Sequence, residues 1–369
     1  MRGQWLGRFH ATGWSGSATV EVDDLGKTFG GRVYLFSRDT NMPSAIAYFE
    51  VPKGDNPARA VAKILPIDPS TGNPTTWDAL AHRFPQLSFA TLAQTTLRWT
   101  QDRMVAVWDS NLGAHGRAFL YKSNAERASE YVETPMEWAQ FKAHVACLEF
   151  RRFVFRGQAK RWRLRTHFHR TGRADLWKYN NEDMTLLHRH LSARTRHTFN
   201  RRDSDENGAF LHLAQHHGFP TPLLDWTYSP YVAAFFAYQK VPKQLSPADA
   251  GSRVRIYQFD RQKWTNDLIQ IPKAAPARPH FSLLEFIAIE NERMIPQQAL
   301  SGLTNVDDVE DYIRSVERSN GTRYLSVIDL PAADRTMVMQ ELSTMGITAG
   351  ALFPGLDGAC EELRERLFP

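Results

Sequence analysis

The chain has 369 residues, of which 42% are hydrophobic and 23% charged, and its formal net charge is +5. This composition excludes a disordered or collagen-like chain, and two cysteines are too few for a disulfide scaffold or a zinc module. Cys147 lies in an apolar helical pattern, so we expect it to be buried. No stretch approaches the about 18 apolar residues that cross a bilayer, and no apolar stretch follows the charged N-terminus as in a signal peptide. We expect a cytoplasmic protein without membrane association.

Residues 1–124 carry the pattern of a β-rich domain. Short alternating runs are separated by turn signals such as Asp24-Leu25-Gly26 and the segment 111–116. Many short strands at such spacing are typical of an antiparallel meander or a small barrel. We expect an independent N-terminal domain with a sensor or regulatory role.

The pattern changes to alternating helices and strands after residue 134. Thr134-Pro135-Met136-Glu137 predicts a capping box, with a helix that continues to about Glu149. The short apolar run 153–155 predicts a buried strand that ends in Arg156-Gly157-Gln158.

Further elements complete an α+β arrangement. Ser204 is expected to cap a helix that ends at Gly218. A strand is predicted over residues 221–226. Ser229-Pro230 predicts the start of an apolar helix over 231–238. We divide this part into a core domain, 134–304, and a C-terminal α/β extension, 305–369.

Positive charge is concentrated in one segment. Between Arg151 and Arg202 there are 15 Lys or Arg and 3 acids, a local balance of +12, so the rest of the chain carries −7. Because arginines interleaved with aromatic residues suit phosphate contacts and base stacking, an anionic partner is indicated. Nucleic-acid contacts are predicted at Arg161, Arg163 and Arg165; the alternative is a solvated basic face.

The histidines do not predict a metal site. His212 and His216 are four residues apart on a predicted helix, but the metalloprotease glutamate is absent between them. We expect His216 to be hydrogen-bonded at the edge of a cleft, with no metal bound.

Two motifs resemble the bacterial FRG-domain family. They are Phe-Arg-Gly-Gln at 155–158 and the longer run Gln-His-His-Gly-Phe-Pro-Thr-Pro-Leu-Leu-Asp-Trp-Thr-Tyr-Ser-Pro at 215–230. The segment 352–358 is similar to the C-terminal signature of that family. The resemblance covers about residues 134–369, and residues 1–124 lie outside it. At position 222 this chain has a proline, where the family usually has a basic or variable residue.

The layout of this family is similar to that of ADP-ribosyltransferases, which implies an NAD site. On that comparison Arg156, Gly157, Gln158, His216 and Trp226 bind NAD. The implied catalytic set is Arg156, Asp225, Thr227, Ser229, Gln297 and Gln298, and the segment 291–299 is the implied third element of the site.

One residue departs from the transferase pattern, since Ala299 stands where a glutamate is expected. The oxocarbenium-like transition state needs a negative charge, and Glu290, Glu292 or Asp225 could supply it. Alternatively, Arg156 and Asp225 form a structural ion pair and Ser229 is only a helix N-cap.

The resemblance implies an NAD-using effector that transfers ADP-ribose or cleaves NAD, with nucleic acid as one target, in phage defence or a toxin system. The alternative is a non-catalytic module that binds nucleic acid or a nucleotide. The sequence leaves the oligomeric state open, a homo-oligomer included.

Overall fold

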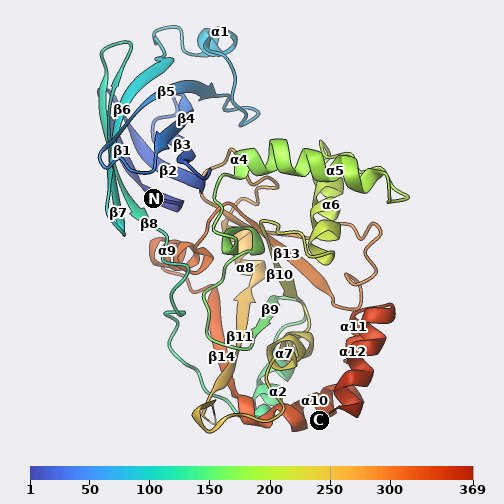
Figure 1. Ribbon diagram of the computed structural model, residues 1–369. Helices are drawn as coiled ribbons and strands as arrows, with labels where there is room; N and C mark the ends of the chain where they lie inside the picture. Colours follow the sequence, from blue (N-terminus) through green and yellow to red (C-terminus); the bar gives the residue numbers. More distant parts are fainter. Residues whose placement is uncertain (250, 369) are drawn as a thin grey trace.

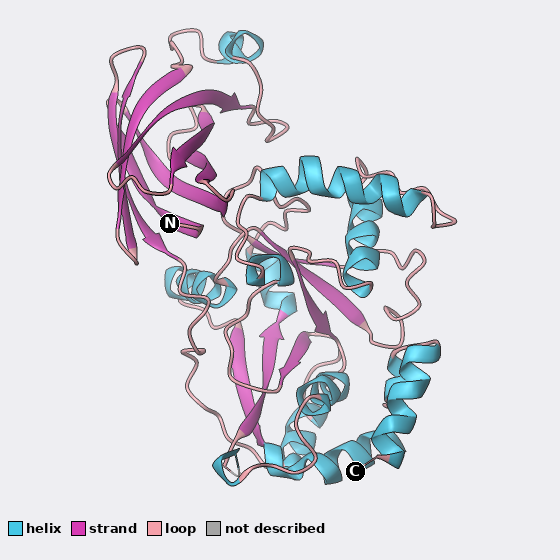
Figure 2. Ribbon diagram, viewed as in Figure 1, coloured by secondary structure: helices cyan, strands magenta, loops and turns pink. Residues whose placement is uncertain are grey.

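The computed structural model describes residues 1–249 and 251–368, which form a β-barrel and a mixed α+β domain (Figures 1 and 2). The barrel has eight strands, each antiparallel to the next, and β1 pairs with β8 to close it. Its strands are β1 (Gly3–Ala11), β2 (Trp14–Asp24), β3 (Thr28–Ser37), β4 (Ser44–Pro52), β5 (Ala58–Ile67), β6 (Leu92–Trp99), β7 (Arg103–Ser110) and β8 (His115–Lys122). The predicted β-rich domain is therefore a closed barrel.

Alternation along the strands decides what the barrel encloses. On β8, buried Gly116, Ala118 and Leu120 alternate with exposed Arg117 and Phe119. Side chains of successive strand residues point to opposite faces, so one row of each strand fills the interior. The long β5–β6 connection carries the short helix α1 (Trp77–Leu80), which lies at the end of the barrel away from the second domain (Figure 1).

The second domain is built on a six-stranded sheet in the order β12-β13-β10-β9-β11-β14, with antiparallel pairing throughout. Its strands are β9 (Phe153–Gln158), β10 (Leu223–Thr227), β11 (Arg253–Asp260), β12 (Phe281–Leu284), β13 (Ala299–Thr304) and β14 (Leu325–Pro331). Because β14 comes from the predicted C-terminal extension and pairs with β11, the extension shares one sheet with the core.

Helices surround this sheet. They are α2 (Trp138–Ala146), α3 (His167–Arg170), α4 (Leu176–Lys178), α5 (Met184–Ser192), α6 (Ser204–His216), α7 (Pro230–Gln239), α8 (Arg261–Asp267), α9 (Val309–Asn320), α10 (Arg335–Thr344), α11 (Ala349–Leu352) and α12 (Leu356–Leu367). The apolar helix α7 packs on β9 and β11, within a core that includes Phe155, Phe235 and Ile256. No helix among the described residues is long and apolar enough to cross a bilayer.

Two predicted helix starts and one burial prediction are corrected. The α2 capping box forms between Glu137 and Gln140, because Thr134 and Met136 instead donate backbone hydrogen bonds to Asp329 on β14. The N-cap of α6 is Asp203, which accepts two backbone N–H groups, and not Ser204. Cys147 is exposed, and it is the C-cap of α2, one residue beyond the last helical residue Ala146.

The barrel and the second domain meet at a polar junction formed by β2, β3 and the segment 173–176. The Asp23 carboxylate accepts hydrogen bonds from Ala174 N (2.7 Å) and Asp175 N (3.2 Å), and Glu21 accepts one from Leu176 N (3.1 Å). Arg32 on β3 pairs with Asp175. The end of β2 is thus tied to the backbone just before α4.

Candidate functional site

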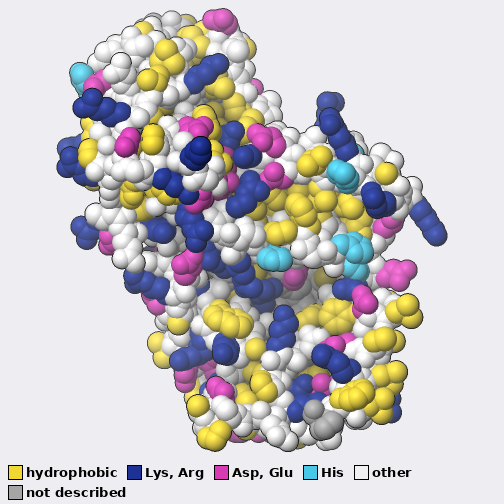
Figure 3. All heavy atoms as spheres, in the orientation of Figure 1, with side chains coloured by type: hydrophobic (Ala, Val, Ile, Leu, Met, Phe, Trp, Pro, Cys, Tyr) yellow, Lys and Arg dark blue, Asp and Glu magenta, His cyan; other side chains and the backbone are white. Residues whose placement is uncertain are grey.

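A cavity of about 380 Å³ lies in the second domain where β9 and β10 face the end of α6, α7 and the segment 291–299. Ligand sites are commonly cavities of roughly 300–1,000 Å³. The sequence-predicted residues that line it are Arg156, Gly157, Gln158, His216, Asp225, Trp226, Thr227 and Gln297. Figure 3 shows a hollow in this face of the molecule with Lys, Arg and His side chains around it.

Gly157 lines the cavity for a packing reason. A Cβ atom built on it would lie 1.8 Å from the backbone oxygen of Ala233 on α7. Only glycine permits β9 to approach α7 this closely. Since β9 carries Arg156 and Gln158, this contact positions both side chains.

Positive charge dominates the cavity. Its lining includes the four cations Arg156, Arg170, Lys240 and Arg293 and the single acid Asp225. Burial lowers the pKa of Arg156 to about 10, with the Asp225 charge acting in the opposite direction, so Arg156 is cationic at neutral pH. Burial also lowers the pKa of Arg170, and the neighbouring Arg165 adds to this effect. An anion in the cavity would relieve both effects.

Arg156 does not form the predicted ion pair with Asp225. Its Nη1 donates to the backbone oxygen of Asp225 (2.6 Å), whereas the Asp225 carboxylate accepts a hydrogen bond from the Gln215 side chain. Arg156 Nε is buried without a partner in the described structure, and so is the side-chain amide of Gln158. These neighbouring groups on β9 have hydrogen-bonding capacity that the protein does not use.

The histidines lie in separate hydrogen bonds. His216 Nδ1 contacts Asn291 Oδ1 at 2.8 Å, which confirms a hydrogen-bonded His216 at this cavity. His212 contacts Ser301 on β13. Burial lowers the pKa of each, and both line the cavity.

Two residues of the predicted catalytic set do not line the cavity. Ser229 Oγ accepts a hydrogen bond from Val232 N (3.2 Å), so it is the N-cap of α7. Gln298 lies in the turn before β13 with a positive φ of 47°, and its backbone oxygen accepts from Tyr228 N. Their placement corrects the prediction that they face the site.

Thr227 and Gln297 lie in the cavity wall and bind each other. Thr227 Oγ1 donates to the backbone oxygen of Gln297 (2.7 Å), and the Gln297 side chain donates to Leu352 O (2.9 Å). These bonds connect β10, the turn before β13 and α11 around the cavity. Neither Glu290 nor Glu292 lines it, so of the three carboxylates considered from the sequence Asp225 alone lies there.

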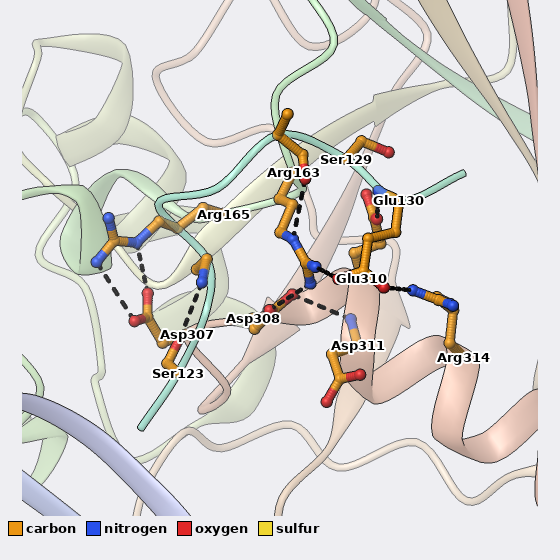
Figure 4. Close-up of polar contacts among 12 residues, drawn as sticks. Ser123, Ser129, Glu130, Arg163, Arg165, Asp307, Asp308, Glu310, Asp311 and Arg314 are labelled. Carbon is orange, nitrogen blue, oxygen red and sulfur yellow. Dashed lines mark hydrogen bonds and ion pairs between the residues drawn. The ribbon is translucent and has the colours of Figure 1, made fainter. Parts of the chain in front are cut away.

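The predicted nucleic-acid contacts at 161–165 are corrected in large part. Arg163 is 3% exposed and pairs with Asp308 and Glu130, and Arg165 pairs with Asp307 (Figure 4). The half-exposed Arg161 pairs with Glu133. Acids from other segments pair with all three arginines, and burial removes Arg163 from the reach of a nucleic-acid strand. Part of the excess positive charge between Arg151 and Arg202 is therefore neutralised by ion pairs within the protein.

The predicted site residues do not include Arg170, Lys240, Arg293, Gln215 or Asn291, although Asn291 and Arg293 belong to the implied third element of the site at 291–299. Arg170 lies inside the basic segment, and Gln215 is the first residue of the second family motif. These two patterns were the signals that could have identified them. Arg293 stacks over Phe353 (5.1 Å), which brings two segments 60 residues apart in the chain to one wall. No local signal in the sequence indicates that contact.

The comparisons concern two parts of the chain. Residues 151–245 match the family model of the FRG domain, an interval that holds β9, α6, β10 and α7. No curated protein matches the chain at a significant level. A solved structure, a de novo designed fluorescence-activating β-barrel, shares 14% identity over 33% of this chain and 94% of that chain, with a TM-score of 0.23.

Proposed function

Since the chain carries an FRG domain at residues 151–245, we propose that this domain binds NAD in the cavity between β9, β10 and α7 and breaks its nicotinamide–ribose bond. The observation that carries the proposal is the excess of cations in a ligand-sized cavity. The ADP-ribosyl group is either transferred to an acceptor or released to water.

The phosphates account for the cations. Arg156 and Arg170 form no ion pair in the described part of the chain, unlike Arg163 and Arg165 in the same segment. Guanidinium groups suit phosphate oxygens because their donors form a planar fork. The aromatic rings of Trp162 and Phe353 at the cavity offer surfaces on which a base or nicotinamide ring can stack.

Asp225 is the carboxylate that supports bond cleavage in this proposal. When nicotinamide leaves with the electron pair of its C–N bond, positive charge develops at the ribose C1′ and ring oxygen. A fixed carboxylate stabilises that charge, and an acceptor oxygen then bonds to C1′ and loses its proton. Gln215 and the backbone of β10 hold Asp225 in place.

A second candidate function is nucleotide binding without turnover. It is favoured by Ala299, which lines the cavity where a transferase of this layout has a glutamate. The two candidates share the binding step and differ in whether nicotinamide is released.

The binding step is tested with Arg156→Ala and Arg170→Ala. We expect each substitution to weaken NAD binding, measured by calorimetric titration, at least about tenfold, because a hydrogen bond to a charged group contributes about 1.5–3 kcal/mol. Arg161→Ala is the matched control, since Arg161 belongs to the same segment and lies outside the cavity. Unchanged affinity in both cavity variants would contradict the proposal.

Cleavage is tested by measuring nicotinamide release from NAD. Asp225→Asn keeps the shape and removes the charge, so we expect about 100-fold slower release with NAD binding retained. If the wild-type protein binds NAD and releases no nicotinamide, with or without DNA or RNA as acceptor, the binding-only function holds.

A further inference from the structure

We propose that the barrel binds an uncharged, largely apolar small molecule in a second cavity, inside β1–β8. This cavity measures about 390 Å³ and lies at the end of the barrel that carries α1. Residues of the β1–β2, β3–β4 and β7–β8 turns, such as Thr12, Met42 and Leu112, line its mouth. It is separate from the FRG-domain cavity and does not depend on the function proposed there.

The cavity arises because inward positions are filled unevenly along the barrel. At the end near the second domain, large side chains pack the interior, among them Trp5, Val22, Val51 and Met104. Toward the other end six inward positions are alanine: Ala45, Ala47, Ala62, Ala93, Ala106 and Ala118 all line the cavity. An eight-stranded barrel is just wide enough for side chains to fill it or for one small ligand. Because six inward positions carry alanine, the side chains leave room for a small ligand in this barrel.

The lining defines the chemistry of the ligand. No charged side chain lines the cavity among residues 1–249 and 251–368, and its few hydroxyl groups include Thr95 and Ser110. Because burying an unpaired charge in such surroundings is very costly, the ligand is uncharged. The rings of Trp14, Phe49 and Trp108 line the walls and suit aromatic or other flat apolar groups.

The size of the cavity limits the ligand further. An apolar cavity of about 150 Å³ stays dry and binds benzene, so one of 390 Å³ holds a molecule of roughly two or three rings. Empty apolar volume destabilises a fold, and stability alone would favour leucine or valine at the alanine positions. A ligand that occupies this space removes the penalty.

Aromatic side chains of the β5–β6 connection form part of the cavity wall. The β5–β6 connection places Trp77 against Phe89 with ring centroids 5.2 Å apart, and Phe84 also stacks on Trp77 at 6.2 Å. Trp77 and Phe89 both line the cavity. These stacked rings extend the apolar wall that a bound molecule would contact.

The test uses N-phenyl-1-naphthylamine, a neutral dye with three aromatic rings whose emission rises in apolar surroundings, with the full-length protein. We expect saturable binding at one site per chain, with quenching of tryptophan emission as the dye binds near Trp14 and Trp108. Ala106→Leu fills the cavity and should weaken binding at least tenfold while the melting temperature is kept or raised. Val107→Leu is the matched control, because Val107 is the next residue on β7 and is 50% exposed.

Ala45→Leu, on the opposite wall, provides an independent filled variant if Ala106→Leu does not fold. Its dye affinity should fall to the same extent, and the dye should raise the melting temperature of the wild-type protein but not of the filled variant. The proposal is overturned if the wild-type protein shows no saturable binding. It is also overturned if folded cavity-filling variants bind the dye as tightly as Val107→Leu.

Discussion

At the scale of single residues, arginines of one segment divide into two groups by their partners. Arg163 and Arg165 are neutralised by Asp308 and Asp307, whereas Arg156 has, among the described residues, a backbone carbonyl as its one partner. The paired arginines are part of the scaffold, whereas the proposed NAD site uses the arginine that has no carboxylate partner in the described structure. Because both groups are arginines of the same basic segment, the local sequence does not distinguish the paired from the unpaired ones.

Two buried histidines give the protein an acid sensitivity. Burial lowers the pKa values of His169 and His280 to about 4. His280 Nε2 donates to Lys273 O (2.8 Å), and its Nδ1 lies 3.0 Å from Ser282 Oγ, so the neutral ring satisfies both contacts. The unfolded chain takes up protons below about pH 6.5, while the folded histidines stay neutral down to about pH 4. Stability contributed by these groups is therefore lost as the pH falls through this window.

We predict that His280→Gln makes the free energy of unfolding less dependent on pH between 6.5 and 4, although it lowers stability at pH 7. Urea unfolding of the variant and the wild type over this range measures the difference, and the comparison cancels carboxylates that titrate in the same window. His82→Gln, at an exposed position, should leave the pH profile unchanged. A wild-type pH profile in His280→Gln would contradict this account.

At the scale of elements, the turn from β10 into α7 shows how one motif serves two tasks. Asp225, Trp226 and Thr227 line the cavity. Ser229, two residues later, accepts a hydrogen bond from the backbone N–H of Val232 in the first turn of α7. Ser229-Pro230 was sufficient to predict this helix start, because an N-cap followed by proline is a local signal. The α2 start was predicted wrongly because pairing of 134–136 with Asp329 on β14, almost 200 residues later, overrides the local capping pattern.

Ser229→Ala separates capping from catalysis. We expect a loss of about 1 kcal/mol in the free energy of unfolding, as for other N-cap serines, with NAD affinity unchanged. Ser229→Asp, which restores a capping acceptor, should recover most of the stability. Loss of nicotinamide release without loss of stability in Ser229→Ala would instead place Ser229 among the catalytic residues.

At the scale of the whole molecule, the barrel is joined to the FRG-containing domain by buried polar contacts. Asp23 accepts two backbone hydrogen bonds from the segment 174–175 and also pairs with Arg173 (3.1 Å). Gln4 on β1 bonds to the backbone of Asn305 and Asp307. Backbone partners tie the position of the barrel to the main chain of the second domain.

We predict that Asp23→Ala uncouples the two parts. Removing the carboxylate leaves two buried N–H groups without an acceptor, which costs about 1–3 kcal/mol each. Scanning calorimetry should then show a lower first melting temperature, with the transition broadened or split in two. Asp55→Ala, at an exposed position in the β4–β5 turn, is the control and should melt like the wild type. Equal melting of both variants would show that Asp23 does not couple the domains.

The sequence by itself determined what short-range patterns specify: a β-rich first part, an α+β second part, the FRG motifs, and the α7 start. It also indicated eight of the residues that line the cavity, because the Arg156–Gln158 end of β9 lies beside Asp225 when β9 and β10 pair antiparallel. Tertiary structure alone decided the rest. Which arginines are neutralised, whether Ser229 and Gln298 face the cavity, and whether Arg170, Lys240 and Arg293 complete it depend on contacts between distant segments. The barrel cavity likewise depends on closure of β8 against β1, which turns strand alanines into the walls of one cavity.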